Sequence, residues 1–179
     1  MQFSRLRSIE GSDRWLLLSL QGLHRFYRGR SMDVVASWMT REEREFAIAD
    51  NTLYAAKVIN TVAKEYSCTN NLVLAGFSQG VAMAFRTAAG VGRPVDGIIA
   101  LGGDVPPELD AAGLSHIRAA LIGRGNNDEW YSAEKLAADE SRLREAGVQV
   151  AVFSFNAAHE WTPEFSRAAA RFLNSISLG

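Results

Sequence analysis

LVLAGFSQGVAMAFRTAA, at residues 72–89, is the stretch of sequence that decides the fold. Its first four residues form an apolar run typical of a buried strand, and from Gln79 onward the pattern is rich in Ala and Met and typical of a helix. Between them, GFSQG at 76–80 matches the G-x-S-x-G pattern. On such a tight turn the serine is forced into a strained conformation with its hydroxyl exposed. This context predicts that Ser78 is a nucleophile; the alternative is an ordinary turn with a serine near the helix cap.

The rest of the chain alternates short apolar runs with longer helical patterns. Strands to pair with this one are predicted from apolar runs at 15–20, 34–39, 95–101, 119–122 and 148–155. Apolar residues at helical spacing predict helices from Phe46 to Tyr66, from Ser132 to Ala146, and from Pro163 to Ile176. Strands that alternate with helices favour the α/β class, with a mostly parallel sheet of about six to seven strands flanked by helices.

Composition and charge narrow the class of protein. A chain of 179 residues has the length of one domain, so we expect a single domain over residues 1–179. Its 19 basic and 20 acidic residues leave a net charge of −1, which disfavours a nucleic-acid partner. Cys68 is the single cysteine, which excludes a disulfide framework and a multi-cysteine zinc site and favours a reducing, cytoplasmic location. The N-terminus lacks a signal-peptide pattern, and we expect no membrane span.

A serine nucleophile needs a base, and the chain has three histidines, His24, His116 and His159. In sheets of this topology, catalytic groups collect at the carboxyl ends of the strands. His159 follows the predicted strand 148–155 and so lies at that edge. His116 precedes its strand, and His24 belongs to a loop that is expected to supply oxyanion contacts. Because His159 also fits the order Ser…Asp…His, we predict that it is the base rather than a solvated loop histidine.

Two aspartates compete for the role of the acid that orients this histidine. Asp128 lies in GRGNNDEW after the predicted strand 119–122, between the serine and the histidine in sequence. Asp104 lies in GGDVPPEL after the predicted strand 95–101 and is the alternative. The sequence favours Asp128, although either residue has a plain interpretation as a turn or cap aspartate.

Two backbone amides are predicted to bind the oxyanion of the transition state. Gln79 follows the serine at the positive end of a helix. The second donor is expected from the loop after strand 15–20, where Gly22 permits close backbone approach and leaves the amide of Leu23 as the donor. This chemistry needs no metal or other cofactor, and the sequence shows no metal-ligand spacing.

These motifs resemble those of the phospholipase/carboxylesterase family of α/β-hydrolases, which includes acyl-protein thioesterases. The matching motifs are GFSQG at 76–80, the aspartate of GNNDEW at 125–130, and AHEW at 158–161, and the likeness runs from Trp15 to the C-terminus. The resemblance implies an α/β-hydrolase fold. It also implies the same roles for the residues selected above: Ser78, Asp128 and His159 as the triad, and Leu23 with Gln79 as the oxyanion hole.

The chain departs from the pattern of this family near its N-terminus. Family members usually carry a His-Gly pair where this chain has Gln21-Gly22, which keeps the backbone donor but changes its hydrogen-bond support. The strands that normally precede this loop are mostly missing. We therefore expect an N-terminally shortened sheet, whose uncovered edge favours a homodimer.

The substrate is predicted from the loops at the rim of the site. No long insertion follows strand 95–101, so we expect no large lid and an open, shallow cleft. Phe26 and Trp161 are the candidates to contact substrate. The sequence thus predicts a serine carboxylesterase acting on a small-molecule ester with a short-to-medium acyl chain. A thioesterase or lysophospholipase-type acyl hydrolase is the close alternative, and a non-catalytic binding protein with the hydrolase fold is the more distant one.

Overall fold

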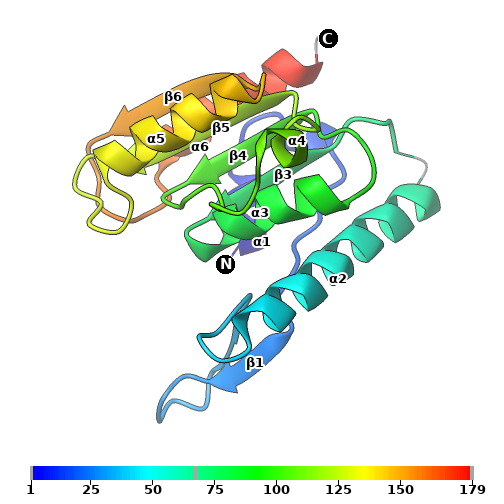
Figure 1. Cartoon of the computed structure of the whole chain (residues 1–179), viewed down its shortest axis with the longest axis vertical. Coiled ribbons are helices and arrows are strands. Elements are labelled where there is room, and N and C mark those ends of the chain that lie inside the picture. The colour runs from blue at the N-terminus through cyan, green and yellow to red at the C-terminus, as the bar shows by residue number, and fades with distance from the viewer. Residues whose placement is uncertain (1, 67, 178–179) are drawn as a thin grey trace.

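The structure, a computed structural model, describes residues 2–66 and 68–177. Within these residues, the main sheet has four parallel strands in the order β3-β4-β5-β6. Figure 1 shows the strands side by side with helices on both faces. The strands are β3 (Val73–Phe77), β4 (Gly97–Leu101), β5 (Ala119–Gly125) and β6 (Gln149–Phe155).

Helices alternate with these strands, which confirms the α/β class and the parallel sheet flanked by helices that the sequence predicts. The N-terminal end of the long helix α2 projects away from the sheet (Figure 1). The helices of this part of the chain are α2 (Arg44–Glu65), α3 (Gln79–Gly90), α4 (Ala111–Leu114), α5 (Ala133–Glu145) and α6 (Pro163–Ser177).

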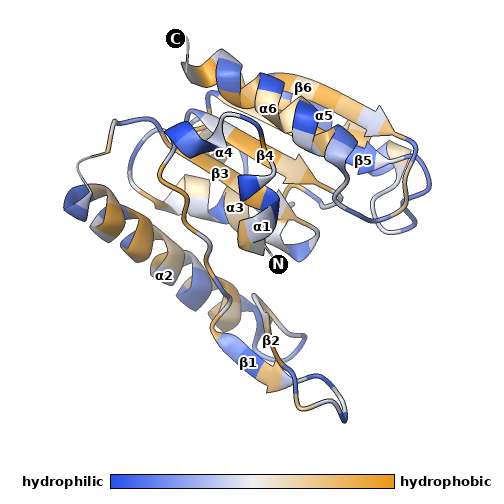
Figure 2. Ribbon diagram, turned by 180° about the vertical axis from the view of Figure 1, so that it is seen from behind, coloured by the Kyte–Doolittle hydropathy of each residue, from blue (hydrophilic) through white to orange (hydrophobic). Residues whose placement is uncertain are grey.

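Alternate side chains of the strands pack into two apolar layers, one on each face of the sheet. In β4, Ile98 and Ala100 are buried in the layer that contains α3 and α5, whereas Ile99 and Leu101 are buried in the layer that contains α6. This is the period of two that a strand imposes on its side chains. Burial on both faces explains why β4 reads as a continuous apolar run, and Figure 2 shows the strands of the sheet largely in the hydrophobic colour.

The main sheet has fewer strands than the roughly six to seven that the sequence favours. Residues 15–20, expected as a strand, form neither a strand nor a ladder with β3. Residues 34–37 do form a strand, β2 (Val34–Ser37), but it pairs with β1 (His24–Tyr27) in a separate antiparallel hairpin. Hydrophobicity does not encode backbone pairing, so the apolar pattern alone does not place such a segment in the sheet.

The N-terminal residues pack on the α6 side of the sheet. Helix α1 (Gln2–Arg7) is followed by the 3-10 turn η1 (Ser12–Arg14), and Ile9 between them is buried in the α6 layer. The Arg5 guanidinium lies over the ring of Phe77, 4.7 Å from its centroid. This contact places α1 beside the carboxyl end of β3, where the candidate site begins.

Candidate active site

Ser78 stands at the turn between β3 and α3, where the sequence predicts the nucleophile. Its backbone has φ +55° and ψ −125°, a combination that L-residues rarely adopt. Gly76 is required at this turn because a Cβ there would lie 2.4 Å from the carbonyl oxygen of Gly80. The Ser78 side chain makes no capping hydrogen bond to α3. Ser78 therefore differs from the ordinary cap serine that was the alternative interpretation.

Asp128 and His159 meet beyond the carboxyl ends of β5 and β6. Nδ1 of His159 and Oδ2 of Asp128 lie 2.8 Å apart. The Asp128 side chain is only 1% exposed, and its Oδ1 accepts hydrogen bonds from the amides of Trp130, at 2.9 Å, and Tyr131, at 3.0 Å. Burial acts to raise the pKa of Asp128, but these amides and His159 outweigh it and hold the pKa below its ordinary value. An ionised carboxylate here favours the Nδ1–H tautomer and leaves Nε2 of His159 able to accept a proton.

The loop after β4 lies between this pair and Ser78. Gly102 has φ +63°, and a Cβ there would lie 3.0 Å from Cε1 of His159 and 3.1 Å from Oδ2 of Asp128. A Cβ on Gly103 would lie 2.4 Å from the backbone oxygen of Ser78. The close approach of all three candidates to one loop therefore depends on two glycines that sequence reasoning missed. Their signal was a Gly-Gly pair directly after a predicted strand.

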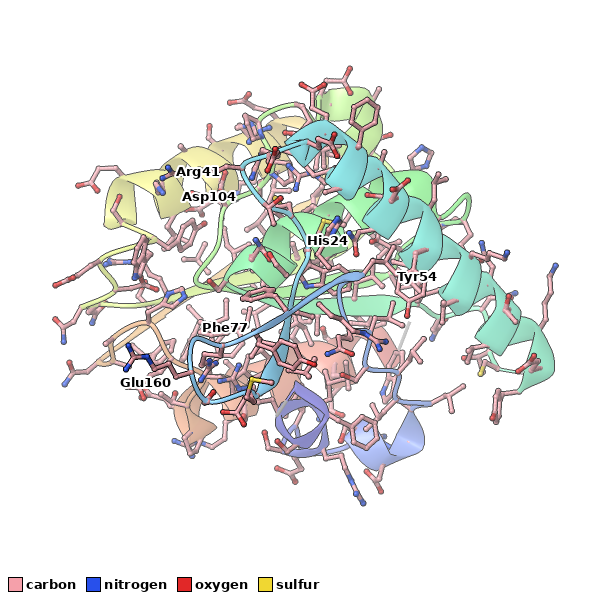
Figure 3. The ribbon with its side chains drawn as sticks, turned by 90° about the horizontal axis from the view of Figure 1, so that it is seen from below. His24, Arg41, Tyr54, Phe77, Asp104 and Glu160 are labelled. Atoms are coloured by element: carbon pink, nitrogen blue, oxygen red, sulfur yellow. The ribbon has the colours of Figure 1, made fainter. Side chains whose placement is uncertain are left out.

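Phe77, the residue before Ser78, gives a second link between the nucleophile and the histidine. Its ring centroid lies 4.8 Å from that of His159. Figure 3 shows Phe77 in the same part of the molecule as Glu160, which follows His159 in the chain. Across the described chain, no hydrogen bond joins the Ser78 hydroxyl to His159. The structure thus joins Asp128 to His159 directly and places Ser78 beside them.

Asp104, the alternative acid, pairs with a different residue. Its Oδ1 lies 3.2 Å from Nζ of Lys135, and its side chain is 55% exposed. Figure 3 shows it beside α5. The other histidines also lie elsewhere, since His116 is exposed before β5 and His24 approaches Asn51, with Nδ1 3.5 Å from its Nδ2. Asp128 is therefore the aspartate that the structure brings to His159.

The two predicted oxyanion donors differ in the structure. Gln79 is the first residue of α3, and within the described residues its backbone N–H has no acceptor, as is usual at a helix N-terminus. The expectation for Leu23 needs correction, because its N–H donates to Oδ1 of Asn51 at 2.9 Å and is not open to a substrate oxygen. The physical reason is that the loop carrying Leu23 does not follow a paired strand, so a side chain from α2 satisfies its backbone.

Sequence reasoning missed Asn51, although the sequence contains a signal for it. Ala47 and Ala55 lie four residues before and after it, and all three are buried on one face of α2. A polar residue within such an apolar stripe needs hydrogen-bond partners. That pattern indicates a buried polar contact but does not show which segment supplies it.

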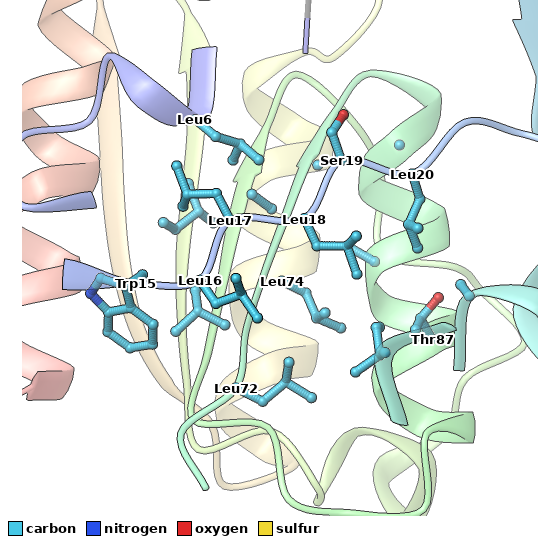
Figure 4. Close-up of a pocket in the computed structure, with 18 of the residues that line it drawn as sticks. Leu6, Trp15, Leu16, Leu17, Leu18, Ser19, Leu20, Leu72, Leu74 and Thr87 are labelled. Carbon is cyan, nitrogen blue, oxygen red and sulfur yellow. The ribbon is translucent and has the colours of Figure 1, made fainter. Parts of the chain in front are cut away.

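A cavity of about 880 Å³ lies beside the nucleophile. Residues 78–80 form part of its lining, and residues 15–20, β3 and α2 contribute apolar side chains (Figure 4). Trp161, one of the two aromatic residues predicted to contact substrate, also lines it. Phe26, the other, is not part of the lining and is 51% exposed on β1. The volume lies within the range of about 300–1,000 Å³ that is common for small-molecule sites.

Residues 2–66 and 68–177 contain neither a metal-binding cluster nor a membrane-spanning helix. No group of three or more His, Cys, Asp and Glu side chains is placed there to hold a metal ion. Over the same residues, each helix is too short or too polar to cross a membrane.

The family model for phospholipases and carboxylesterases matches residues 32–177 of the chain. The chain belongs to this phospholipase/carboxylesterase family. The match runs from just before β2 through α6 and so includes Ser78, Asp128 and His159. No curated protein is significantly similar to the chain in sequence.

Solved structures share the fold of this phospholipase/carboxylesterase family member. SOBER1 of Arabidopsis thaliana aligns with a TM-score of 0.75 and 17% sequence identity, over 97% of this chain and 90% of that chain. The Bacillus cereus carboxylesterase aligns with a TM-score of 0.73 and 19% identity, over 97% of this chain and 80% of that chain. At these identities the likeness concerns the fold, and it confirms the α/β-hydrolase fold that the motifs implied. Membership of the family supports a hydrolase.

Proposed function

We propose that this protein is a serine carboxylesterase that hydrolyses small-molecule esters with short-to-medium acyl chains. The observation that carries the proposal is the 2.8 Å contact between buried Asp128 and His159, beside a serine at a strained turn. The Ser78 side chain makes no capping hydrogen bond, so helix capping does not explain a serine in this conformation. The strain is instead typical of a nucleophile presented to a substrate.

The proposed reaction begins with attack by the serine. Oγ of Ser78 attacks the ester carbonyl carbon while Nε2 of His159 accepts its proton. Asp128 accepts the Nδ1–H hydrogen bond and stabilises the imidazolium that forms. The Gln79 N–H, at the N-terminus of α3, stabilises the negative charge on the carbonyl oxygen.

Three further proton transfers complete the cycle. The tetrahedral intermediate collapses, and the leaving alcohol takes the proton from His159, which leaves an acyl group on Ser78. His159 then removes a proton from water, and the hydroxide attacks the acyl carbon. Collapse of the second intermediate releases the carboxylic acid and returns the proton to Ser78.

The cavity supports the proposed range of acyl chains. Leu18, Leu74 and Ala63 are among the apolar residues that line it, and the Ser78 turn forms part of the same wall. An alkyl chain attached to Ser78 would leave water for this apolar surface, at about 0.8 kcal/mol for each buried CH₂. Chains of increasing length should therefore react faster until the cavity is filled.

The test is hydrolysis of nitrophenyl esters from acetate to laurate by the wild type and by Ser78→Ala. We expect a maximum at short-to-medium chains in the wild type and a loss of kcat of about 10⁴-fold or more in the variant. A fluorophosphonate probe should label the wild type at Ser78. Turnover that persists in Ser78→Ala, or neither turnover nor labelling in the wild type, would refute the proposal. Matched ester and thioester substrates then separate a carboxylesterase from a thioesterase.

A further inference from the structure

Asn51 is a fully buried polar residue on α2, with 0% of its surface exposed. An unsatisfied carboxamide in this position would destabilise the fold. Its Oδ1 accepts from the N–H of Leu23 at 2.9 Å, and its Nδ2 donates to the carbonyls of Trp38, at 2.9 Å, and Ala47, at 2.8 Å. One side chain therefore ties the loop around Leu23 and the segment after β2 to the same helix.

A second carboxamide holds the other side of that segment. Oε1 of Gln79 accepts from the N–H of Trp38 at 2.9 Å and from the hydroxyl of Ser37 at 3.2 Å, and its Nε2 donates to the carbonyl of Met39 at 3.1 Å. The backbone of Trp38 is thus hydrogen-bonded on both sides: its C=O accepts from Asn51, and its N–H donates to Gln79. This chain of hydrogen bonds ends on the residue directly after Ser78.

The two loops also touch through their backbones. A Cβ on Gly22 would lie 2.4 Å from the carbonyl oxygen of Ser37 and 3.0 Å from the backbone nitrogen of Trp38. Displacement of either loop therefore moves the other. Because β2 ends at Ser37, no strand ladder holds the backbone of Trp38, and the two carboxamides take over that task.

We propose that Asn51 is a positioning residue that, through Trp38, fixes Gln79 at the start of α3. The inference rests on the proposed function, in which the Gln79 N–H stabilises the oxyanion. A displacement of about 1 Å at such a donor can lower the rate about a hundredfold, so the link affects catalysis as well as stability. Neither a carboxylate nor an alkyl side chain can replace Asn51, because the site needs an acceptor and two donors.

The principal test is Asn51→Asp, which keeps the shape and the acceptor for Leu23 but faces Trp38 and Ala47 with an oxygen instead of donors. We expect kcat for a nitrophenyl ester to fall about 10–100-fold while KM stays within about twofold. Benzeneboronic acid, which forms a tetrahedral adduct with an active serine, should lose affinity by the same factor as kcat/KM. Those two losses report on the transition state, which a purely structural residue would not affect.

Asn60→Asp is the matched control. Asn60 lies on the same helix, is half-buried, and donates through Nδ2 to the carbonyl of Val91 at 3.1 Å, with no link to Ser78. It should lose stability to heat but retain kcat and boronate affinity. If Asn51→Asp behaves in the same way, Asn51 is a structural residue and the proposal is overturned.

Gln79→Met cuts the same link from its exposed side and keeps the backbone N–H of residue 79, so the proposal stays testable if Asn51→Asp does not fold. We expect Gln79→Met to lose about tenfold in kcat and in boronate affinity. In the double variant with Asn51→Asp, the two losses should not add, because both substitutions break the same link. Wild-type kcat in Gln79→Met would overturn the proposal while the esterase itself stands. Absence of esterase activity and of fluorophosphonate labelling in the wild type would instead remove the proposed function, and this inference with it.

Discussion

The two sides of the candidate site are held in different ways. On the acid–base side, Asp128 and His159 follow β5 and β6, which pair along seven residues each. Backbone amides then orient the Asp128 carboxylate. On the other side, the loop around Leu23 and the segment around Trp38 belong to no strand of the main sheet. Side-chain carboxamides hold them.

This difference separates what the fold supplies from what individual side chains supply. Parallel pairing of β5 with β6 brings their carboxyl ends to one edge whatever residues the strands contain. The carboxamide-held side depends on a few polar residues with both donors and acceptors. We therefore expect substitutions on the acid–base side to remove chemistry from an intact scaffold, whereas substitutions on the other side also alter the scaffold.

The largest effect is expected from Asp128→Asn. The amide can present an N–H to His159 in place of an acceptor, which favours the wrong tautomer, so kcat should fall about 10³–10⁴-fold. Asp104→Asn is the control, because that carboxylate is exposed and paired with Lys135, and it should retain nearly full activity. The measurement is steady-state hydrolysis of a nitrophenyl ester. Equal losses in the two variants would contradict the assignment of Asp128.

A smaller effect is expected from Gly102→Ala, which introduces a methyl group 3.0 Å from Cε1 of His159. The ring must move, and kcat/KM should fall about 10–100-fold. Gly92→Ala is the matched control, since Gly92 also has a positive φ, +73°, but nothing lies within 4 Å of the added carbon. Both variants should lose about 1–2 kcal/mol of stability through the left-handed backbone. If Gly92→Ala loses as much activity as Gly102→Ala, strain and not contact with His159 is responsible.

The acid–base side is also the side that the sequence predicts best. The motif at 76–80 lies between a predicted strand and a predicted helix, and His159 follows another predicted strand; the structure confirms strands at both places. Strand direction, which the alternation of strands and helices already indicates, places Ser78 and His159 at the same edge of the sheet. The choice between Asp128 and Asp104 requires the three-dimensional contacts of each carboxylate, because both residues follow a strand. Contacts such as the one from Asp104 to Lys135 are visible only in three dimensions.

The carboxamide-held side could not be predicted in the same way. Asn51 and Leu23 are 28 residues apart, and no periodic pattern connects a helix position to a particular loop amide. Residues 15–20 illustrate the same limit, since their apolar run predicts a buried strand, whereas Trp15, Leu17 and Leu20 are only half-buried and the segment has no place in the sheet. Leu16 and Leu18 remain 49% and 36% exposed. Pairing depends on backbone geometry, and hydrophobicity alone does not encode it.

The smallest effect is expected in the pH dependence of stability, where two buried aspartates should behave in opposite ways. The pKa of folded Asp128 lies below that of the unfolded chain, near 3.8, because the hydrogen bonds outweigh its burial. Its ionised form therefore stabilises the fold above that value, and the stabilisation is lost as the pH falls through the folded pKa. For Asp139, burial raises the pKa, so the folded state loses stability as the pH rises from 3.8 through the folded value.

Asp128→Asn and Asp139→Asn turn this contrast into a measurement, because neither asparagine titrates. Urea unfolding between about pH 3 and about pH 8 gives the free energy of unfolding of each variant relative to the wild type. The stability advantage of the wild type over Asp128→Asn should grow as the pH rises and then level off. Over Asp139→Asn it should shrink, although Val105 and Tyr131 donate to this carboxylate at 2.9 and 3.0 Å. If both advantages shrink as the pH rises, burial controls both carboxyls; if both grow, hydrogen bonds outweigh burial at Asp139 as well.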